Sequence, residues 1–433
     1  MAVIPLFAMT LEACVPSITP VPLPDPGIPG FSFPVPEADI VGWTEQDDQT
    51  AINKHGWGLW TAVTALTDQD YNGQKLRVFE TWQSPSDITD GSGPTPHALK
   101  PLNQRDQEQG STHGGENLIG DVRYDPTAAQ HIIDNGLLSK AALTKLLDDG
   151  QKKIPDFPAA ALTLKPIFQK ALQKQLVDGR YYKLATWPGP PGAQLPGDNI
   201  AFPPRDWKEC VWVDFQNGGA GEGAVDKTCD PKGSSRTANT TYNIDSFILI
   251  DVTPPLLPGS LALEEHAILV GMHITTREIT RWTWQTFWWS PNPDEPKFPS
   301  SKAIAKDRPA QLKGPARNYV NSLAYNMVFP PQPNTGGKNE GNSVYAYNPW
   351  LEAEFDAKTL PDSEPGVFNG RMVPNNVGMQ TNCMSCHARA NFNPNKIKNA
   401  PDYAGDRYAD IGGNEFAGVL TTDFLWSLHE HAK

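Results

Sequence analysis

Residues 267–289 read AILVGMHITTREITRWTWQTFWW, and this stretch carries the clearest strand patterns in the chain. Its first part, Ala267 to Thr275, is a largely apolar run of the kind that forms a buried strand. Its second part, Arg281 to Trp289, has a period of two, as a half-buried strand requires. This period gathers three indoles on one face: Trp282, Trp284 and Trp288. We predict bulky core strands here; the alternative use of the indoles is to line a pocket or relay electrons.

Other segments add both strands and helices. A helix is expected over Gly56 to Leu66, and another over Phe416 to Glu430. Asp125 to Asp149 is expected to hold two helices, the first capped by Asp125 and ended by Gly136, the second capped by Ser139. Three further segments have strand patterns: Leu76 to Trp82, Val211 to Phe215 and Ser246 to Val252. The mixture predicts an α+β fold, with a central strand-rich region and a C-terminal segment of mostly helix and loop.

Residues Cys383-Met384-Ser385-Cys386-His387 match C-x-x-C-H, the attachment pattern of c-type haem. At this spacing two thiols add across the two vinyl groups of haem, and the adjacent histidine lies under the iron. A zinc site would need two further Cys or His ligands at finger-like spacing, and the sequence has no second pair. A redox dithiol would follow a βαβ pattern, whereas Pro374 to Gly378 reads as a loop. We predict one covalent haem on Cys383 and Cys386, with His387 as an axial ligand.

The 433 residues are expected to form three parts. Residues 1–40 read as a leader and a proline-rich tether, since 15–36 contain eight prolines and suggest an extended spacer. Residues 41–349 read as the α+β body. Residues 350–433 read as the haem-binding segment, packed on that body.

The remaining cysteines fit an oxidising compartment, where c-type haem is attached. Cys210 and Cys229 are expected to form a disulfide, because structural disulfides persist in such spaces. Leu11-Glu12-Ala13-Cys14 resembles a bacterial lipobox, although Glu12 departs from the small or apolar residue expected there. A lipid anchor at Cys14 is one interpretation, and an incidental cysteine is the other. The predicted location is the periplasm or another space outside the cytoplasm.

The sixth iron ligand is left open by the sequence. His273 is the tentative distal ligand, because a histidine in an apolar strand needs a partner. Met379, close to the motif, is the alternative, and an iron without a sixth protein ligand is another. The remaining candidates are Met372, Met327, Met272, His266, His131, His113, His97, His55, His429 and His431. An open distal side would also need an acid–base group or a cationic donor, for which the candidates are Arg277, Arg281 and Arg389.

The formal net charge of −13 bears on partners. An acidic surface repels nucleic acid and favours basic proteins. No basic patch is present to supply the electrostatic part of nucleic-acid binding. We therefore expect a basic redox partner protein and no nucleic-acid partner.

Short matches scattered over the chain support a resemblance to a known group. They are Gly58-Leu59-Trp60, Glu80-Thr81-Trp82, Gly271-Met272-His273-Ile274, Trp284-Gln285-Thr286-Phe287, Asn382 to His387 and Asp423-Phe424-Leu425-Trp426-Ser427. In these the chain resembles large secreted bacterial monohaem cytochromes whose attachment site is near the C-terminus. It is similar, more weakly, to the cross-linked-haem cytochromes that oxidise hydroxylamine, but the lysine of that cross-link is not identified here. The resemblance implies haem and secretion.

Three functions are compatible with these observations. The first is a monohaem c-type cytochrome that transfers electrons in the bacterial periplasm or at the cell surface. The second is a haem oxidoreductase with an open distal site, acting on peroxide or on a small nitrogen or organic substrate. The third is a haem sensor that binds a gas without turnover. The large body outside the haem segment favours the second.

Overall fold

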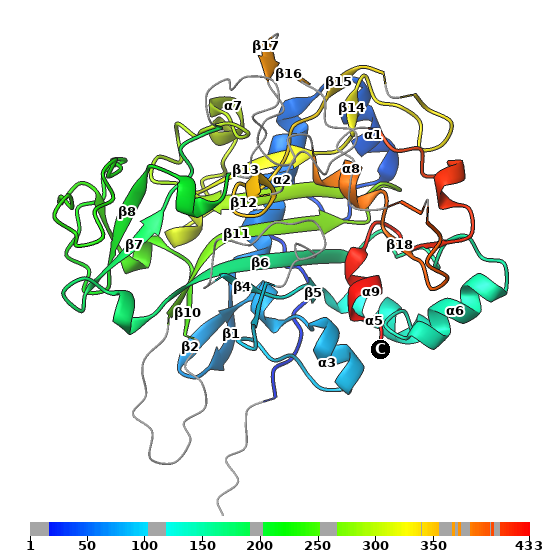
Figure 1. The fold of residues 1–433 in the computed structure, drawn as a ribbon, viewed down its shortest axis with the longest axis horizontal. Coiled ribbons are helices and arrows are strands. Elements are labelled where there is room, and N and C mark those ends of the chain that lie inside the picture. The colour runs from blue at the N-terminus through cyan, green and yellow to red at the C-terminus, as the bar shows by residue number, and fades with distance from the viewer. Residues whose placement is uncertain are drawn as a thin grey trace, which may run out of the picture.

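The fold comes from a computed structural model, which describes residues 17–102, 118–190, 202–251, 266–338, 340–354, 366–368, 371–373, 382–398, 400–401 and 408–433 (Figure 1). It contains helices and several sheets, so the predicted α+β class is confirmed. Within those ranges, no helix has the length and apolar character needed to cross a bilayer.

An antiparallel sheet of eight strands forms the centre of the molecule. Its path runs β13-β12-β11-β6-β4-β3, with β10 paired to β11 and β5 paired to β6. The strands are β3 (Lys100–Pro101), β4 (Leu118–Gly120), β5 (Arg123–Tyr124), β6 (Leu162–Ala171), β10 (Leu249–Asp251), β11 (His266–Thr276), β12 (Thr283–Trp289) and β13 (Tyr319–Ala324). The two long runs of the opening sequence are therefore neighbouring central strands, as their apolar character requires.

Smaller sheets surround this centre. A three-stranded sheet has the order β7-β8-β9, and the others have two strands each. Their strands are β7 (Tyr181–Ala185), β8 (Cys210–Asp214), β9 (Thr241–Asn243), β1 (Leu66–Tyr71), β2 (Gln74–Arg77), β14 (Val328–Phe329), β15 (Asn342–Ser343), β16 (Gly366–Phe368), β17 (Arg371–Val373), β18 (Asn391–Phe392) and β19 (Leu420–Thr421). The predicted strand at Val211 to Phe215 is confirmed as β8. The one expected over Ser246 to Val252 is confirmed only as β10, because Ser246 ends a 3₁₀ turn and Val252 lies outside the described residues.

Most α-helices are short, the longest described one being α2 with 15 residues. They are α1 (Glu37–Glu45), α2 (Gln49–Val63), α3 (Pro85–Asp90), α5 (Pro126–Asn135), α6 (Lys140–Asp148), α7 (Lys302–Lys306), α8 (Cys383–His387) and α9 (Trp426–His431). The predicted caps of α5 and α6 are confirmed. Asp125 accepts a bond from the Ala128 amide, Gly136 ends α5 at φ 61°, and Ser139 accepts from the Ala142 amide.

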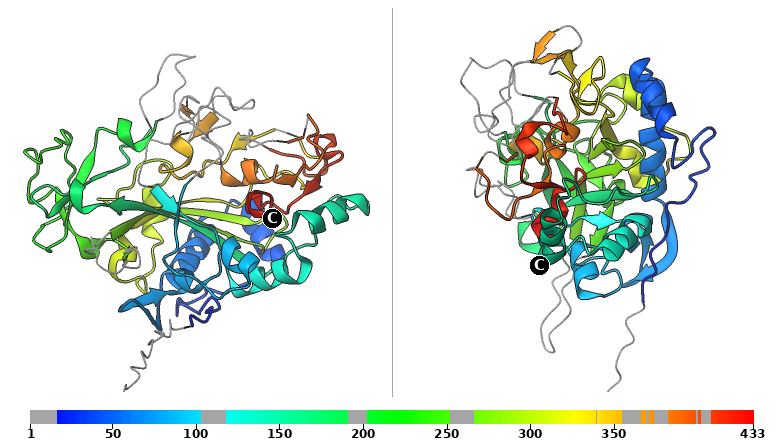
Figure 2. Two further views of the ribbon diagram at one scale, coloured as in Figure 1. Left: turned by 60° about the horizontal axis from the view of Figure 1, so that its bottom comes forward. Right: turned by 90° about the vertical axis from the view of Figure 1, so that its right-hand side faces the viewer.

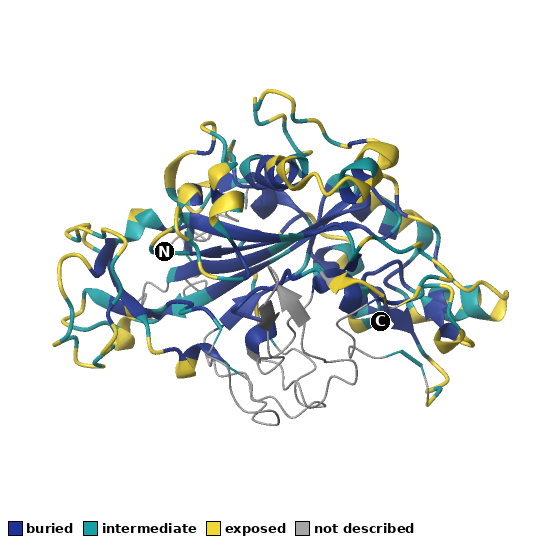
Figure 3. Cartoon of the chain, turned by 90° about the horizontal axis from the view of Figure 1, so that it is seen from above, coloured by how far each residue is buried: buried dark blue, intermediate teal, exposed yellow. Residues whose placement is uncertain are grey.

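The chain ends cover opposite faces of the sheet. Figure 2 shows the C-terminal helices α8 and α9 on one face and the N-terminal helices α1 and α2 on the other. Helix α8 contacts β12, and α2 contacts β13. Figure 3 shows the sheet as the buried centre, with the exposed residues in the surrounding loops and helices.

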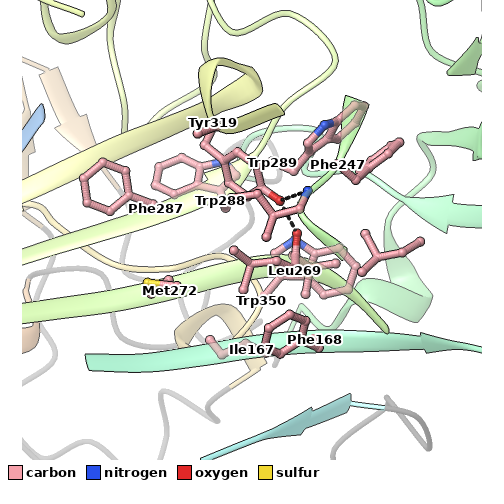
Figure 4. Packing of buried hydrophobic residues seen from close by; sticks show 14 of the residues in the cluster. Ile167, Phe168, Phe247, Leu269, Met272, Phe287, Trp288, Trp289, Tyr319 and Trp350 are labelled. Atoms are coloured by element: carbon pink, nitrogen blue, oxygen red, sulfur yellow. Dashed lines mark hydrogen bonds between the residues drawn. The ribbon is translucent and has the colours of Figure 1, made fainter. Parts of the chain in front are cut away.

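Aromatic side chains fill the core between sheet and helices (Figure 4). The Trp60 ring of α2 stacks on Phe287 of β12, with ring centroids 4.4 Å apart. Tyr319 is fully buried, and its hydroxyl donates to the Leu269 carbonyl at 2.7 Å. This bond gives the buried hydroxyl the partner that it needs. Core packing is thus the main role of the aromatic residues on this face of the sheet.

Several predicted elements are wrong in part. The helix expected over Gly56 to Leu66 ends at Val63, and Leu66 begins β1. The strand expected over Leu76 to Trp82 stops at Arg77, where the Glu80 carboxylate accepts the Arg77 amide and starts a 3₁₀ turn over Val78–Thr81. Trp282 lies outside β12 with φ 58°, so it does not continue the row of Trp284.

The C-terminal helix expected over Phe416 to Glu430 begins only at Trp426. Gly418, Asp423 and Phe424 have φ values of 83°, 48° and 70°. These left-handed conformations are incompatible with a continuous helix. A short strand, β19, and a corner therefore replace the first part of the predicted helix.

The proline-rich segment is extended, but it is not the free spacer expected from the sequence. Residues 17–36 pack along the body, because their backbone groups find partners there. The Trp82 indole donates to the Val21 carbonyl at 2.7 Å, and the Val35 amide donates to the Glu278 carboxylate at 2.7 Å. Ile18 and Val35 are buried. The expected spacer is therefore part of the folded body from residue 17 onward.

The predicted disulfide between Cys210 and Cys229 is present and closes a loop with a sequence separation of 19 residues. Closing a loop of this size restricts the unfolded chain and contributes about 3 kcal/mol to stability. We expect the double variant Cys210→Ser/Cys229→Ser to lose about 2–4 kcal/mol of unfolding free energy, measured by urea denaturation. Addition of a reductant should lower the unfolding midpoint of the wild type and leave that of the double variant unchanged.

Candidate haem attachment site

The C-x-x-C-H motif forms the one-turn helix α8. Hydrogen bonds of Asn382 and Cys383 hold the start of this helix. Asn382 caps the helix, because its side-chain oxygen accepts the Ser385 amide at 2.9 Å. The amide nitrogen of the same side chain donates to the carbonyls of Met327 and Val344. The Cys383 amide donates to the Ala346 carbonyl at 3.2 Å. These bonds fasten the motif to the segment that follows β13.

The register of the central strands decides which side chains face α8. In antiparallel strands, directly paired residues point to the same face. Thr275 pairs with Trp284, and His273 pairs with Thr286. Alternation along each strand therefore puts His273 and Trp284 on one face. The Trp284 ring lies against His387, with centroids 4.2 Å apart, so this is the face that α8 covers.

His387 is held with one ring nitrogen engaged and the other available. Its Nδ1 donates to the Phe424 carbonyl at 2.8 Å, which fixes the tautomer and leaves Nε2 as the lone-pair nitrogen. Burial lowers the pKa of His387 to about 4, so the neutral, metal-binding form is present at neutral pH. A carbonyl partner of this kind orients metal-ligating histidines in general.

The residues of α8 fit a covalently bound haem. Cys383 and Cys386 form no disulfide and lie on the same helical turn as His387. Burial raises the pKa of the Cys383 thiol well above its usual value, so that sulfur is a protonated thiol rather than a thiolate. A neutral imidazole is the species that binds iron. The donor set therefore matches the predicted group.

A second donor set lies beside the first sulfur. His273 Nδ1 is 4.0 Å from Cys383 Sγ, and His273 Nε2 is 3.0 Å from a Glu352 oxygen. Donor atoms of these three residues all lie within 4.8 Å of one another, close enough to surround one metal ion. The tentative distal ligand is thus placed beside an attachment sulfur, with its other nitrogen held by a carboxylate.

Glu352 is positioned by a tight turn that approaches the sheet. Its second oxygen accepts the Asn348 amide at 2.6 Å, and the Asn348 side chain donates to Thr286 Oγ1 at 2.9 Å. A β-carbon at Gly271 would lie 2.7 Å from this side-chain amide, so only glycine allows the approach. The turn therefore aims Glu352 at His273.

Several other proposed ligands have partners elsewhere or fall outside the described residues, and His431 ends α9 with a pKa lowered by burial. His55 contacts Tyr325 and Glu278, on the face opposite α8. Met272 alternates with His273, so it also points to that opposite face. Four more histidines have partners away from α8: His97 with Glu80, His131 with Pro155, His266 with Asp251 and His429 with Phe392.

Of the proposed methionine ligands, Met327 has a partner of its own. Met327 Sδ accepts the Ala409 amide at 3.3 Å. Met372 belongs to β17, and no side-chain position is described for it. Three predicted positions lie outside the described residues: Cys14, His113 and Met379.

The three arginines proposed as distal donors have protein partners. Arg277 pairs with Asp156 and Asp423. Arg281 donates to the Pro333 carbonyl, and Arg389 donates to the Ser385 carbonyl at 3.1 Å. Each is therefore a structural arginine in this conformation.

Sequence reasoning missed two groups that contact the motif. Glu352 lies 79 residues from His273, and no local pattern connects them. The Phe424 group is a backbone carbonyl, which every residue type carries, so residue identity gives no signal. Asp423 and Phe424 stood out in the sequence only through the short match with secreted cytochromes.

No protein-family model matches this chain, and no curated protein or solved structure is significantly similar to it. The case for the site therefore rests on the motif and on the contacts described above.

The depressed pKa of His387 predicts how the haem-free protein responds to acid. Between the ordinary pKa of 6.5 and the folded value of about 4, the unfolded state binds more protons than the folded state. Stability should therefore be complete above about pH 6.5 and fall as the pH drops toward 4, by about 1–3 kcal/mol. Unfolding free energies measured by urea denaturation should change more steeply with pH for the wild type than for His387→Gln. Equal slopes would contradict the burial of a neutral imidazole.

Proposed function

We propose that the protein is a monohaem c-type cytochrome that transfers electrons outside the bacterial cytoplasm. The observation that carries the proposal is the state of His387. Its Nδ1 donates to a carbonyl, so Nε2 carries the lone pair, and two cysteines that form no disulfide lie on the same turn. This combination is what covalent attachment and axial ligation require.

The chain's own groups have distinct roles in this proposal. Cys383 and Cys386 hold the haem through thioether bonds, and His387 binds the iron through Nε2. Phe424 orients the imidazole, and Trp284 packs against its ring. The bound haem supplies a site that takes up and releases one electron. The net charge of −13 favours a basic redox partner.

A haem enzyme is the alternative, and the pair of His273 and Glu352 favours it. A carboxylate-bound imidazole is a common acid–base unit, and this one lies beside the Cys383 sulfur. In the electron-transfer proposal, His273 or Met379 completes the coordination of the iron. In the enzyme proposal that position stays open, and the His273–Glu352 pair moves protons for a small substrate.

His273, Glu352 and Cys383 also favour a third candidate, which is a divalent metal site formed by these three residues. Zinc accepts sulfur, nitrogen and oxygen ligands of this kind. It would need Cys383 as a thiolate, which haem attachment excludes. Elemental analysis of protein purified from a haem-attaching host separates the two: stoichiometric iron with covalent haem supports the cytochrome, and stoichiometric zinc without haem supports the metal site.

Covalent attachment is tested by the double variant Cys383→Ala/Cys386→Ala. We expect the wild type, produced with a haem-attachment system, to carry the mass of one haem through denaturation, because thioether bonds survive it. The double variant should carry none. The matched control is Cys210→Ser/Cys229→Ser, which removes two other cysteines and should keep the haem. A wild type without covalent haem would overturn the proposed function.

The visible spectrum in the presence of carbon monoxide decides between the two haem functions. We expect a low-spin spectrum that carbon monoxide leaves unchanged, because two protein ligands suit electron transfer. A high-spin spectrum that shifts with carbon monoxide would instead support the enzyme. The variant His273→Ala should become high-spin only if His273 is the sixth ligand.

A further inference from the structure

The corner at Asp423 and Phe424 is the most unusual backbone feature near the motif. Both residues have positive φ values, 48° and 70°, and neither is glycine. L-residues rarely adopt this conformation, because it crowds the β-carbon, and two in succession must be held by surrounding contacts. Residues in such conformations gather at functional sites. The question is therefore what holds this corner and what the corner holds.

The carboxylate of Asp423 anchors the corner to two other segments. Its side chain has no exposed surface. Arg277 Nε, just after β11, lies 3.0 Å from one oxygen, and Lys153 Nζ, after α6, lies 2.8 Å from the other. A buried carboxylate between two cations is strongly restrained, since moving it would leave buried charge without a partner.

Neighbouring backbone bonds fasten the corner to the motif itself. The Thr422 amide donates to the Ala390 carbonyl at 3.0 Å, three residues after His387. The Thr422 hydroxyl donates to the Leu425 carbonyl at 2.9 Å. The Phe424 ring is buried in the same cluster as Cys383. The peptide after Phe424 therefore has little freedom to turn, and its carbonyl stays aimed at His387 Nδ1.

We propose that Asp423 is a positioning residue that sets the reduction potential of the haem iron by locking the Phe424 carbonyl onto His387 Nδ1. This inference rests on the proposed function and deepens it. A bond from Nδ1–H to a carbonyl makes the imidazole more basic and strengthens its donation through Nε2. Stronger donation favours the oxidised, more positively charged iron. Loosening the corner should therefore raise the potential.

The test is potentiometric titration of the haem-containing protein, comparing wild type with Asp423→Asn. Asparagine tolerates positive φ but carries no charge for Arg277 and Lys153 to hold. We expect the oxidised-to-reduced equilibrium to shift at least tenfold toward the reduced state, which is 59 mV for one electron. The mass of covalent haem should remain that of the wild type.

Asp156→Asn is the matched control. Asp156 also pairs with Arg277 and Lys153, but its side chain is 65% exposed, whereas that of Asp423 is fully buried. Its removal deletes the same charge from the same two cations. We expect less than a twofold shift in the redox equilibrium. Equal shifts in both variants would overturn the proposal, because the effect would then belong to the cations.

A charge-neutral variant, Asp423→Asn/Arg277→Gln, separates positioning from charge. It removes both members of the buried Arg277–Asp423 pair and so leaves no buried arginine without that partner, which also protects the fold. If the corner positions the imidazole, the double variant should keep most of the shift of the single variant. A return to the wild-type potential would overturn the positioning role. A wild type without covalent haem would overturn the proposed function instead, and with it this inference.

Discussion

The register between β11 and β12 is the constraint on which the candidate site depends. Because paired residues share a face, one register brings Trp284 and His273 to the side that α8 covers. A slip of one residue between these two strands would put His273 and Trp284 on opposite faces of the sheet. The apolar character of both strands and their central place in the sheet stabilise this register. Core packing thus also fixes the surroundings of the motif.

His387 is restrained from two directions by different kinds of contact. Trp284 provides a ring face that limits tilting, and the Phe424 carbonyl provides a directional bond that limits rotation. The first contact comes from a rigid strand, and the second comes from a corner with an unfavourable backbone. The ion pairs of Asp423 stabilise the corner and so offset the unfavourable free energy of its backbone conformation.

The sequence predicted those features that are encoded locally. The strands appear as apolar runs, α5 and α6 carry their caps, and C-x-x-C-H is a compact motif. The disulfide followed from the expected compartment. Long-range features were not predictable: no pattern connects Glu352 with His273, and a carbonyl such as that of Phe424 has no residue signature.

The wrong predictions have a related cause. Phe416 to Glu430 has helical periodicity, but bonds of Thr422 to Ala390 and of Thr421 to Lys152 hold its first half in another conformation. The proline-rich residues 17–36 looked like a spacer because prolines favour extended chain. Extended chain can equally pack on a surface when its backbone groups find partners, as those of Val21 and Val35 do.

Both chain ends are fastened to distant parts of the sequence, and this has a consequence for the order of folding. Val35 bonds to Glu278 over 243 residues, and Tyr124 bonds to Ser427 over 303 residues. Contacts between such remote positions form slowly, because the chain must close very long loops first. Cys383 and Cys386 are buried in the folded protein, and Cys383 meets His273 across 110 residues, so its burial also waits for a long loop to close. The topology therefore gives slow chemistry on the two sulfurs time to finish before the protein closes around them.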